Sequence, residues 1–196
     1  MKSKAVVIAC LLALCSVVAV GEGFGSAPSR SLLRYDRPIG VLIGRKSLDR
    51  KLVRLKLEKS KFVLTVLYGG RPLKSYPVVL GADPVHNKLC EGDGCTPEGD
   101  FKIVQIRSPH KWSRFLLLSY PTAASRTRFL AARRAGRLTA RAAIGGMIGI
   151  HGVPRGYDSA IDAHQNWTAG CIALKTRDII EIAGVCTRGT PVKIVH

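Results

Sequence analysis

The sequence contains few acidic and few aromatic residues. Only 13 of its 196 residues are Asp or Glu, against 31 Lys and Arg, so the formal net charge is +18; aromatic residues make up 6%. Such an excess of positive charge promotes attraction to polyanions in general. However, the sequence has no recognisable nucleic-acid-binding motif and few aromatic side chains, which argues against a nucleic-acid partner.

No apolar run reaches the length of a membrane-spanning helix. The run at residues 5–20 has sixteen residues, whereas a spanning helix needs about 20. Lys2 and Lys4 flank its start and small residues follow it, which is the order of a secretory signal peptide. We therefore predict that residues 1–21 are a signal peptide cleaved after Gly21. The alternative is a retained membrane anchor.

Cleavage would leave a strongly basic protein. It removes two lysines and no acidic residue, which leaves 29 basic and 13 acidic residues, a net charge of +16. For an exported protein, anionic wall or membrane polymers fit this charge better than nucleic acid does. The alternative is a solvated basic surface that serves solubility.

Export also removes two of the six cysteines with the signal peptide. Those that remain are Cys90, Cys95, Cys171 and Cys186. The first two flank a Gly-containing turn, CEGDGC, and an oxidising compartment favours disulfides, so we predict a local Cys90–Cys95 disulfide. Two free thiols are the alternative. No second closely spaced Cys or His pair accompanies them, and we therefore predict no metal site.

The chain divides into an arm and one domain. Residues 22–50 are rich in Gly, Ser, Pro and Arg and are predicted to be a linker or a partly ordered arm, and residues 51–196 form the domain. Apolar residues that alternate with polar ones predict strands, and Gly69-Gly70 predicts a hairpin turn. The predicted strands are 51–59, 61–68, 71–81, 101–107, 115–121, 147–151 and 191–196. Residues 82–100 are turn formers and are expected to form a long exposed loop.

Two helices are predicted in the domain. Residues 122–143 are rich in Ala and Arg, and we expect a surface helix whose charged side is a solvated face. A second helix runs from Thr176, its predicted cap, to about Ala183. Several short strands with few helices indicate a mostly β, α+β fold.

The stretch NWTAGCIAL, residues 166–174, contains the cysteine that most suggests chemistry. A cysteine acts as a nucleophile when a nearby base or positive dipole favours its thiolate. The best-placed base is His151, which ends the apolar strand MIGIH and is followed by Gly152. The polar, turn-rich segment between them lets the chain return Cys171 beside the strand end. Taken alone, each residue has a structural alternative, a buried thiol and a core histidine.

Two further side chains have structural interpretations. Cys186 is expected to be a buried free thiol in the last helix or at its exit. Trp167 is expected to support the cysteine loop by packing, with stacking on a sugar as the alternative.

The motifs IHG and TAGCIAL, together with SYPVVLG and GDGCTPEGDFKI, resemble the YkuD-type L,D-transpeptidase catalytic domain. The resemblance covers roughly residues 52–195. It implies a mixed β-sandwich with short helices and a catalytic Cys-His pair that acts on bacterial cell-wall peptides. TAGCIAL marks a variant of the family, since Ala169 and Ala173 stand where the common pattern has a histidine and an arginine.

The resemblance also implies a role for individual residues. Cys171 would be the nucleophile and His151 its base, with the ring oriented by the carbonyl of Gly152. The candidates for the oxyanion hole and for substrate binding are the Cys171 amide and residues Gly170, Thr168 and Ala169. No metal or organic cofactor is implied.

We therefore expect an exported cysteine acyltransferase that remodels peptidoglycan stem peptides by L,D-transpeptidation through a thioester acyl-enzyme. With water as the acceptor, the same site would be an L,D-carboxypeptidase or an amide hydrolase. An alternative of another class is a non-catalytic basic module that binds the wall. The expected partners are stem peptides, with anionic wall or membrane polymers as further candidates. We expect a monomer, secreted across the inner membrane into the periplasm or cell wall.

Overall fold

The computed structural model describes residues 32–44 and 48–196. The predicted signal peptide, residues 1–21, and the first part of the predicted arm lie outside the described residues. Among the helices of the described part, none is long and apolar enough to cross a membrane.

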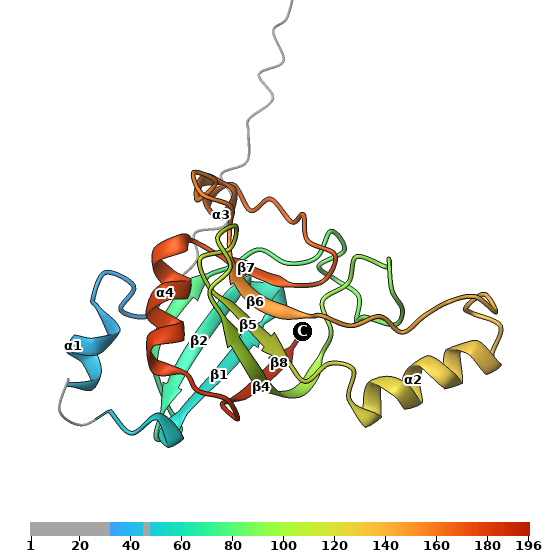
Figure 1. Cartoon of the computed structure of the whole chain (residues 1–196), viewed down its shortest axis with the longest axis horizontal. Coiled ribbons are helices and arrows are strands. Elements are labelled where there is room, and N and C mark those ends of the chain that lie inside the picture. The colour runs from blue at the N-terminus through green and yellow to red at the C-terminus, as the bar shows by residue number, and fades with distance from the viewer. Residues whose placement is uncertain (1–31, 45–47) are drawn as a thin grey trace, which may run out of the picture.

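A mixed sheet of eight strands forms the body of the protein (Figure 1). Its strands are β1 (Val53–Glu58), β2 (Val63–Tyr68), β3 (Arg71–Pro77), β4 (Gly99–Arg107), β5 (Phe115–Leu118), β6 (Gly149–Gly152), β7 (Ile172–Leu174) and β8 (Pro191–Val195). Their order in the sheet is β3-β2-β1-β8-β4-β5-β6-β7. The β1–β8 and β6–β7 pairs are parallel, and the other pairs are antiparallel. The helices are α1 (Ile39–Ile43), α2 (Ala123–Arg134), α3 (Ser159–Asp162) and α4 (Thr176–Val185), with short 3-10 turns at Arg50–Leu52 and Lys59–Lys61.

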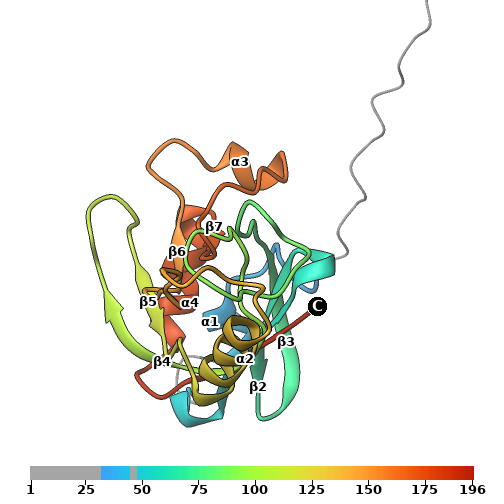
Figure 2. The same ribbon diagram turned by 90° about the vertical axis from the view of Figure 1, so that its right-hand side faces the viewer.

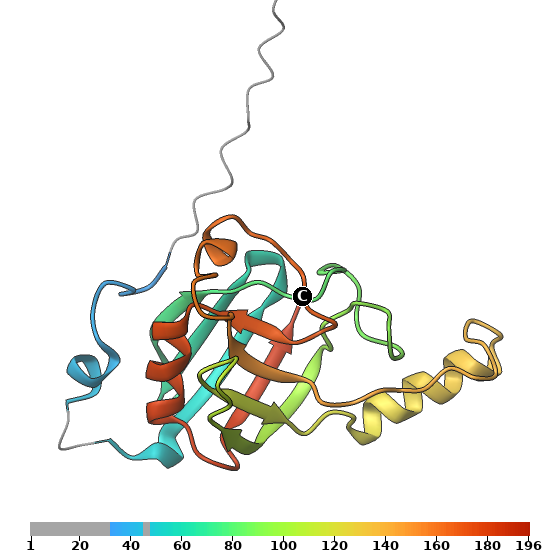
Figure 3. The ribbon, with the colours of Figure 1, turned by 45° about the horizontal axis from the view of Figure 1, so that its top comes forward.

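Strand β4 joins the two halves of the sheet. Its residues 99–102 pair with β8, and residues 103–107 pair with β5. The β4–β5 register shifts between Ile103 and Gln105, and an extra residue of this kind bends a strand. As a result, the half that contains β1, β2, β3 and β8 faces the half that contains β5, β6 and β7 (Figures 2 and 3).

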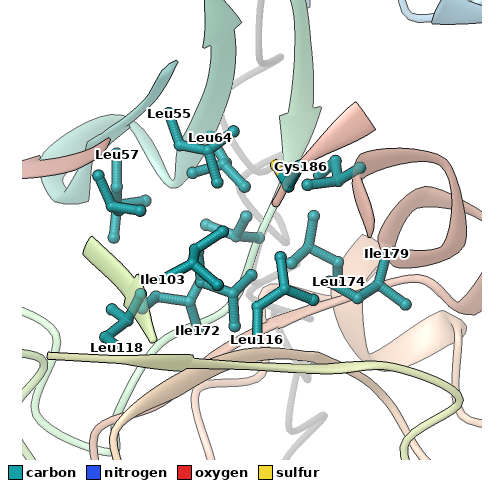
Figure 4. Close-up of a cluster of buried hydrophobic side chains, with 14 of the residues drawn as sticks. Leu55, Leu57, Leu64, Ile103, Leu116, Leu118, Ile172, Leu174, Ile179 and Cys186 are labelled. Carbon is teal, nitrogen blue, oxygen red and sulfur yellow. The ribbon is translucent and has the colours of Figure 1, made fainter. Parts of the chain in front are cut away.

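The core lies between these two halves. Along β1 the residues alternate between buried and more exposed positions, as the sequence pattern predicts. Leu55 and Leu57 of β1 share one cluster with Leu116 of β5, Leu174 of β7 and Cys186, a free thiol (Figure 4). Burial of each leucine stabilises the fold by about 1.5–3 kcal/mol. The structure confirms the predicted mixed β-sandwich with short helices and the buried Cys186 thiol.

The predicted hairpin connects β2 to β3. Gly69 and Gly70 have φ angles of 58° and 81°. A two-residue hairpin turn requires positive φ at its central positions, which glycine adopts without a steric penalty. The Gly-Gly signal in the sequence therefore identified this turn correctly.

Helix α2 is shorter than the predicted 122–143. Thr122 caps its start, because the Thr122 hydroxyl accepts a hydrogen bond from the Ser125 amide at 3.2 Å. Gly136, with a φ of 69°, follows the helix end. The helix projects from the body of the protein, and residues 135–148 return from its far end to β6 (Figure 1).

Helix α4 begins as predicted but is capped differently. Thr176 is its first residue, and its hydroxyl is not the cap. Instead, Asp158 Oδ1 accepts a hydrogen bond from the Thr176 amide at 2.9 Å. The predicted Thr176 cap is therefore wrong, because a carboxylate from a distant segment satisfies the helix terminus.

The described part of the predicted arm packs on β3 and α4. Ile39 of α1 is 3% exposed. Lys74 of β3 is buried, donates to the Arg37 carbonyl at 2.7 Å and pairs with Glu181 of α4 at 2.8 Å. The Tyr76 hydroxyl donates to the same Glu181 oxygen at 2.9 Å. A buried ionic cluster thus connects the arm, the sheet and α4.

We expect Glu181→Ala to lower the free energy of unfolding by about 3 kcal/mol, because it leaves the buried Lys74 ammonium without its counter-charge. Urea denaturation measures this loss. The double variant Lys74→Met/Glu181→Ala should recover at least half of it, since no unpaired charge remains. A Glu181→Ala loss below about 1 kcal/mol would contradict the importance of this pair.

Candidate active site

Strands β6 and β7 position the predicted catalytic pair. Ile150 pairs with Ile172 and His151 pairs with Ala173. Side chains alternate between the faces of a strand, so His151 and Ala173 share a face. Cys171 immediately precedes β7, and its Sγ lies 3.4 Å from the Gly149 amide of β6. The parallel pairing therefore brings Cys171 beside the strand that carries His151.

The segment after β3 holds the cysteine loop in place. The Leu80 amide donates a hydrogen bond to Asn166 Oδ1 at 2.8 Å. Gly81 then forms a bridge to Thr168. Residues of the predicted strand 71–81 beyond the end of β3 therefore fix the turn that leads to Cys171.

The His151 ring is oriented by its own strand. Its Nδ1 lies 2.8 Å from the Gly152 carbonyl oxygen. A carbonyl only accepts hydrogen bonds, so Nδ1 carries the proton and Nε2 of the neutral ring keeps a free lone pair. Burial lowers the pKa of His151, and the hydrogen bond to Gly152 opposes this only in part. Burial therefore favours the neutral form of the His151 ring, with its proton on Nδ1.

Aromatic side chains clamp the His151 ring. Phe115 stacks on it with a centroid distance of 5.6 Å and an interplanar angle of 6°. Trp112 lies 4.6 Å away, and Trp167 lies 6.0 Å away at 70°. A Cβ on Gly149 would lie 2.6 Å from the Phe115 ring, so glycine is needed at this position for the stack to form. The clamp restricts His151 to one orientation.

Only part of this clamp was predictable from the sequence. Trp167 packs as predicted, since it stacks on Trp112 at a centroid distance of 5.8 Å and an angle of 23°, with 41% of its surface exposed. Trp112 and Phe115 were missed, because they come from the loop before β5 and from β5 itself.

The Cys171 thiol is held protonated. Burial raises its pKa, while the Gly149 amide, 3.4 Å from Sγ, and the charge of Lys88 lower it to a smaller extent. Sγ also lies 3.6 Å from the Met147 carbonyl oxygen, to which it donates. Attack by this sulfur therefore requires transfer of its proton to a base.

A small turn precedes Cys171. The Thr168 hydroxyl donates to the Cys171 carbonyl at 2.7 Å and accepts from the Gly170 amide at 3.1 Å. Gly170 has a φ of 128°, and a Cβ there would lie 2.5 Å from the Cys95 carbonyl oxygen. Thr168 is buried and shapes the turn. Because Thr168 already engages the Gly170 amide, the Cys171 amide is the better candidate for the oxyanion hole.

A cavity of about 200 Å³ lies beside Cys171. Residues 145–148, which return from α2, form one wall, and Lys88, Glu91 and Ala169 contribute to the others. Ala169, a predicted substrate contact, is exposed at this cavity. The cavity gives a substrate access to the sulfur.

Lys88 is a site residue that sequence reasoning missed. Its side chain is 3% exposed, and Nζ donates to Asp93 Oδ1 at 2.8 Å and to the Ala169 carbonyl at 3.3 Å. It therefore connects the loop 82–100 to the turn before Cys171. The only signal in the sequence was the acidic Gly-containing turn that supplies Asp93.

The structure corrects the predicted Cys90–Cys95 disulfide, because both cysteines are free thiols. The Asp93 carboxylate organises this loop instead. It accepts the amides of Cys90 and Cys95, each at 2.9 Å, and that of Leu89 at 2.7 Å. Asp93 also pairs with Lys88. A carboxylate that joins three amides and a lysine closes the turn without a covalent bridge.

We expect Lys88→Met to raise the pKa of the Cys171 thiol further, because it removes a positive charge that favours the thiolate. The rate of alkylation of Cys171 by iodoacetamide, followed against pH by peptide mass spectrometry, should move to higher pH. Lys61→Met, which changes an exposed lysine, is the matched control and should leave the profile unchanged. A profile that stays in place or moves to lower pH in Lys88→Met would contradict this role.

Comparisons with known proteins agree with this geometry. A family model described as the L,D-transpeptidase catalytic domain, YkuD, matches residues 53–194. No curated protein matches the chain.

Solved structures share the fold. The helical cell shape determining protein Pgp2 from Campylobacter jejuni is similar with a TM-score of 0.54 and 21% identity, over 73% of this chain and 47% of that one. Bd1075 from Bdellovibrio bacteriovorus has a TM-score of 0.50 and 19% identity, over 74% of this chain and 48% of that one. The chain thus spans about half the length of these two proteins, and at these identities the likeness shows the fold alone.

The family assignment rests on the match of the family model to most of the chain, including both β6 and β7. The chain belongs to the YkuD family of L,D-transpeptidase catalytic domains.

Proposed function

We propose that this protein is an exported cysteine acyltransferase that remodels peptidoglycan stem peptides through a thioester acyl-enzyme. The observation that supports the proposal is the pairing of β6, which carries His151, with β7, which directly follows Cys171, together with the cavity that Cys171 lines. Family membership supports the substrate class. The proposed place of action is the periplasm or cell wall.

The proposed reaction begins with proton transfer from Cys171 Sγ to Nε2 of His151. The sulfur electron pair attacks the amide carbonyl that follows an L-centre of the stem peptide, and the Cys171 amide donates to the resulting oxyanion. Collapse of this intermediate breaks the C–N bond, and His151 returns its proton to the leaving amine. An amine of a second peptide then attacks the thioester and releases the free thiol.

Water in place of the second amine would make the same site a carboxypeptidase or an amide hydrolase. The acyl-enzyme is common to both outcomes, so the choice depends on which acceptor reaches the thioester. Ala173 bears on substrate binding as well. It is fully buried in a small apolar cluster with Val79, Val153 and Ile161, which has no room for the arginine of the common family pattern.

Incubation of the protein, without residues 1–21, with tetrapeptide muropeptides tests the proposal. Cross-linked dimers in the mass spectrum indicate transpeptidation, and trimmed tripeptides indicate hydrolysis. Cys171→Ala should abolish either product, and Cys186→Ala should retain it. Unchanged muropeptides with the native chain, or full activity in Cys171→Ala, would reject the catalytic proposal and leave a non-catalytic wall-binding module.

His151→Ala should lower turnover by about 10² to 10⁴, the usual value of general-base assistance. Circular dichroism and thermal unfolding should show that the variant keeps its fold. Turnover within about threefold of the native rate would contradict the assignment of His151 as the base.

A carbapenem should form one covalent adduct per chain. Its strained amide carbonyl is open to the same sulfur attack, and the adduct should map to the tryptic peptide that contains residues 166–175. The three other cysteines of the described chain are internal controls, and burial raises the pKa of Cys186 to about 12, so its thiolate is scarce. An adduct on Cys186 in place of Cys171 would contradict the nucleophile assignment.

A further inference from the structure

Positive charge is concentrated in the part of the chain around α2. Residues 101–157 contain eleven Lys and Arg and no Asp or Glu. Six of these cations are arginines between residues 122 and 143. An ion pair within this segment is therefore impossible, and a negative partner has to come from elsewhere.

Helix α2 separates its buried side from its charged side. Ser125, Phe129 and Ala132 are its buried residues. Arg126, Leu130, Arg133 and Arg134 follow the i, i+4, i+7 and i+8 spacing of one helix face, and all four are exposed. Arg137, in the turn after the helix, is exposed as well. We call Arg126, Arg133, Arg134 and Arg137 the arginine face.

Local structure accounts for only part of the arginine face: Arg133 donates a hydrogen bond to the Ala140 carbonyl at 3.2 Å and lies 5.9 Å from the Phe129 ring centroid. In residues 32–44 and 48–196, none of its members forms a salt bridge. Arg133 and Arg134 lie in the last turn, where the helix dipole favours cations. The same dipole disfavours Arg126, which lies near the N-terminus of a helix that has no acidic residue in its first turn.

The chain leads from the arginine face back to the proposed active site. Helix α2, about 18 Å long at 1.5 Å per residue, projects away from the sheet (Figures 1 and 3). The chain then returns along residues 135–148, and Gly145, Gly146 and Met147 form a wall of the cavity beside Cys171. A ligand bound along α2 would therefore lead to the sulfur.

We propose that the arginine face binds carboxylates of the peptide chains on polymeric peptidoglycan, so that the protein acts on the assembled wall in preference to free muropeptides. This inference rests on the proposed function. A polymer that carries many peptides presents carboxylates at repeated intervals, and one peptide can enter the cavity while its neighbours contact α2.

The side chains of α2 favour this partner over an anionic membrane. All cations of the segment 122–143 are arginines, whose planar fork binds a carboxylate through two parallel hydrogen bonds. Leu130, 47% exposed, is the one large apolar side chain that α2 exposes. Helices that lie in a membrane interface need a much larger apolar face.

Binding to insoluble peptidoglycan tests the proposal in a chain that carries Cys171→Ala, so that no turnover is needed. The arginine-face variant replaces the four residues of the arginine face by Gln. The matched control replaces four exposed cations elsewhere by Gln: Lys51, Arg54, Arg71 and Arg188. Both variants lose the same net charge, and co-sedimentation at increasing salt gives the Kd of each.

We expect the arginine-face variant to bind insoluble peptidoglycan about tenfold more weakly. Its binding should also lose most of its salt dependence, because several exposed ion pairs with the polymer are removed together. The control should change Kd by less than about twofold. Equal weakening in both variants would overturn the proposal, as would tight native binding to glycan strands stripped of their peptides. Preferential binding to anionic phospholipid vesicles would also overturn it, in favour of a membrane partner.

With Cys171 intact, the arginine-face variant should show a raised KM for polymeric wall and little change in kcat. The ratio of kcat/KM for polymer to that for soluble muropeptide should therefore fall. A fall in kcat alone would contradict the inference. Absence of any turnover by the native chain on soluble muropeptides would reject the proposed function, while the sedimentation result would still decide the role of the arginine face.

Discussion

The parallel pairing of β6 with β7 is the constraint on which the site depends. His151 lies opposite Ala173, so this register brings Cys171, which immediately precedes β7, beside the strand that carries His151. A shift of one residue in the register would turn the side chains of β7 to the opposite face. The bridge from Gly81 to Thr168 and the glycine at position 170, close to the Cys95 carbonyl, maintain the register from the other side of the cysteine loop.

Burial favours the uncharged forms of both the Cys171 thiol and the His151 imidazole. The same loss of water raises the pKa of the Cys171 thiol and lowers the pKa of His151, because both charged forms are disfavoured. The resting pair is therefore a thiol and a neutral imidazole. The Gly152 carbonyl selects the tautomer whose Nε2 accepts a proton. In the proposed reaction, charge therefore develops only when a substrate carbonyl is attacked.

Local and long-range features differed in how far the sequence predicted them. Gly69-Gly70 and the alternating strands were predictable, because turn chemistry and pleating act between neighbours. The return of the Cys171 segment beside the strand that carries His151 was also predictable, because the chain between them is polar and rich in turn formers. The Phe115 and Trp112 clamp, the contact of Lys88 with the Ala169 carbonyl and the Asp158 cap of α4 were not, because each joins segments that only the fold brings together. The predicted Cys90–Cys95 disulfide was wrong for a local reason, because the Asp93 carboxylate between the two cysteines accepts the amides of both and closes the turn without a covalent bridge.

We propose that the resting site pairs a neutral His151 with a protonated Cys171. Nitrogen-15 NMR of the histidine side chains, recorded from pH 4 to pH 9 on the native chain and on Cys171→Ala, distinguishes this pair from a thiolate–imidazolium pair. We expect His151 to be neutral at pH 7 with its proton on Nδ1 in both proteins, and its pKa to lie below the usual value of a histidine. A doubly protonated His151 at pH 7 in the native chain that becomes neutral in Cys171→Ala would indicate a thiolate–imidazolium pair and would reject this proposal.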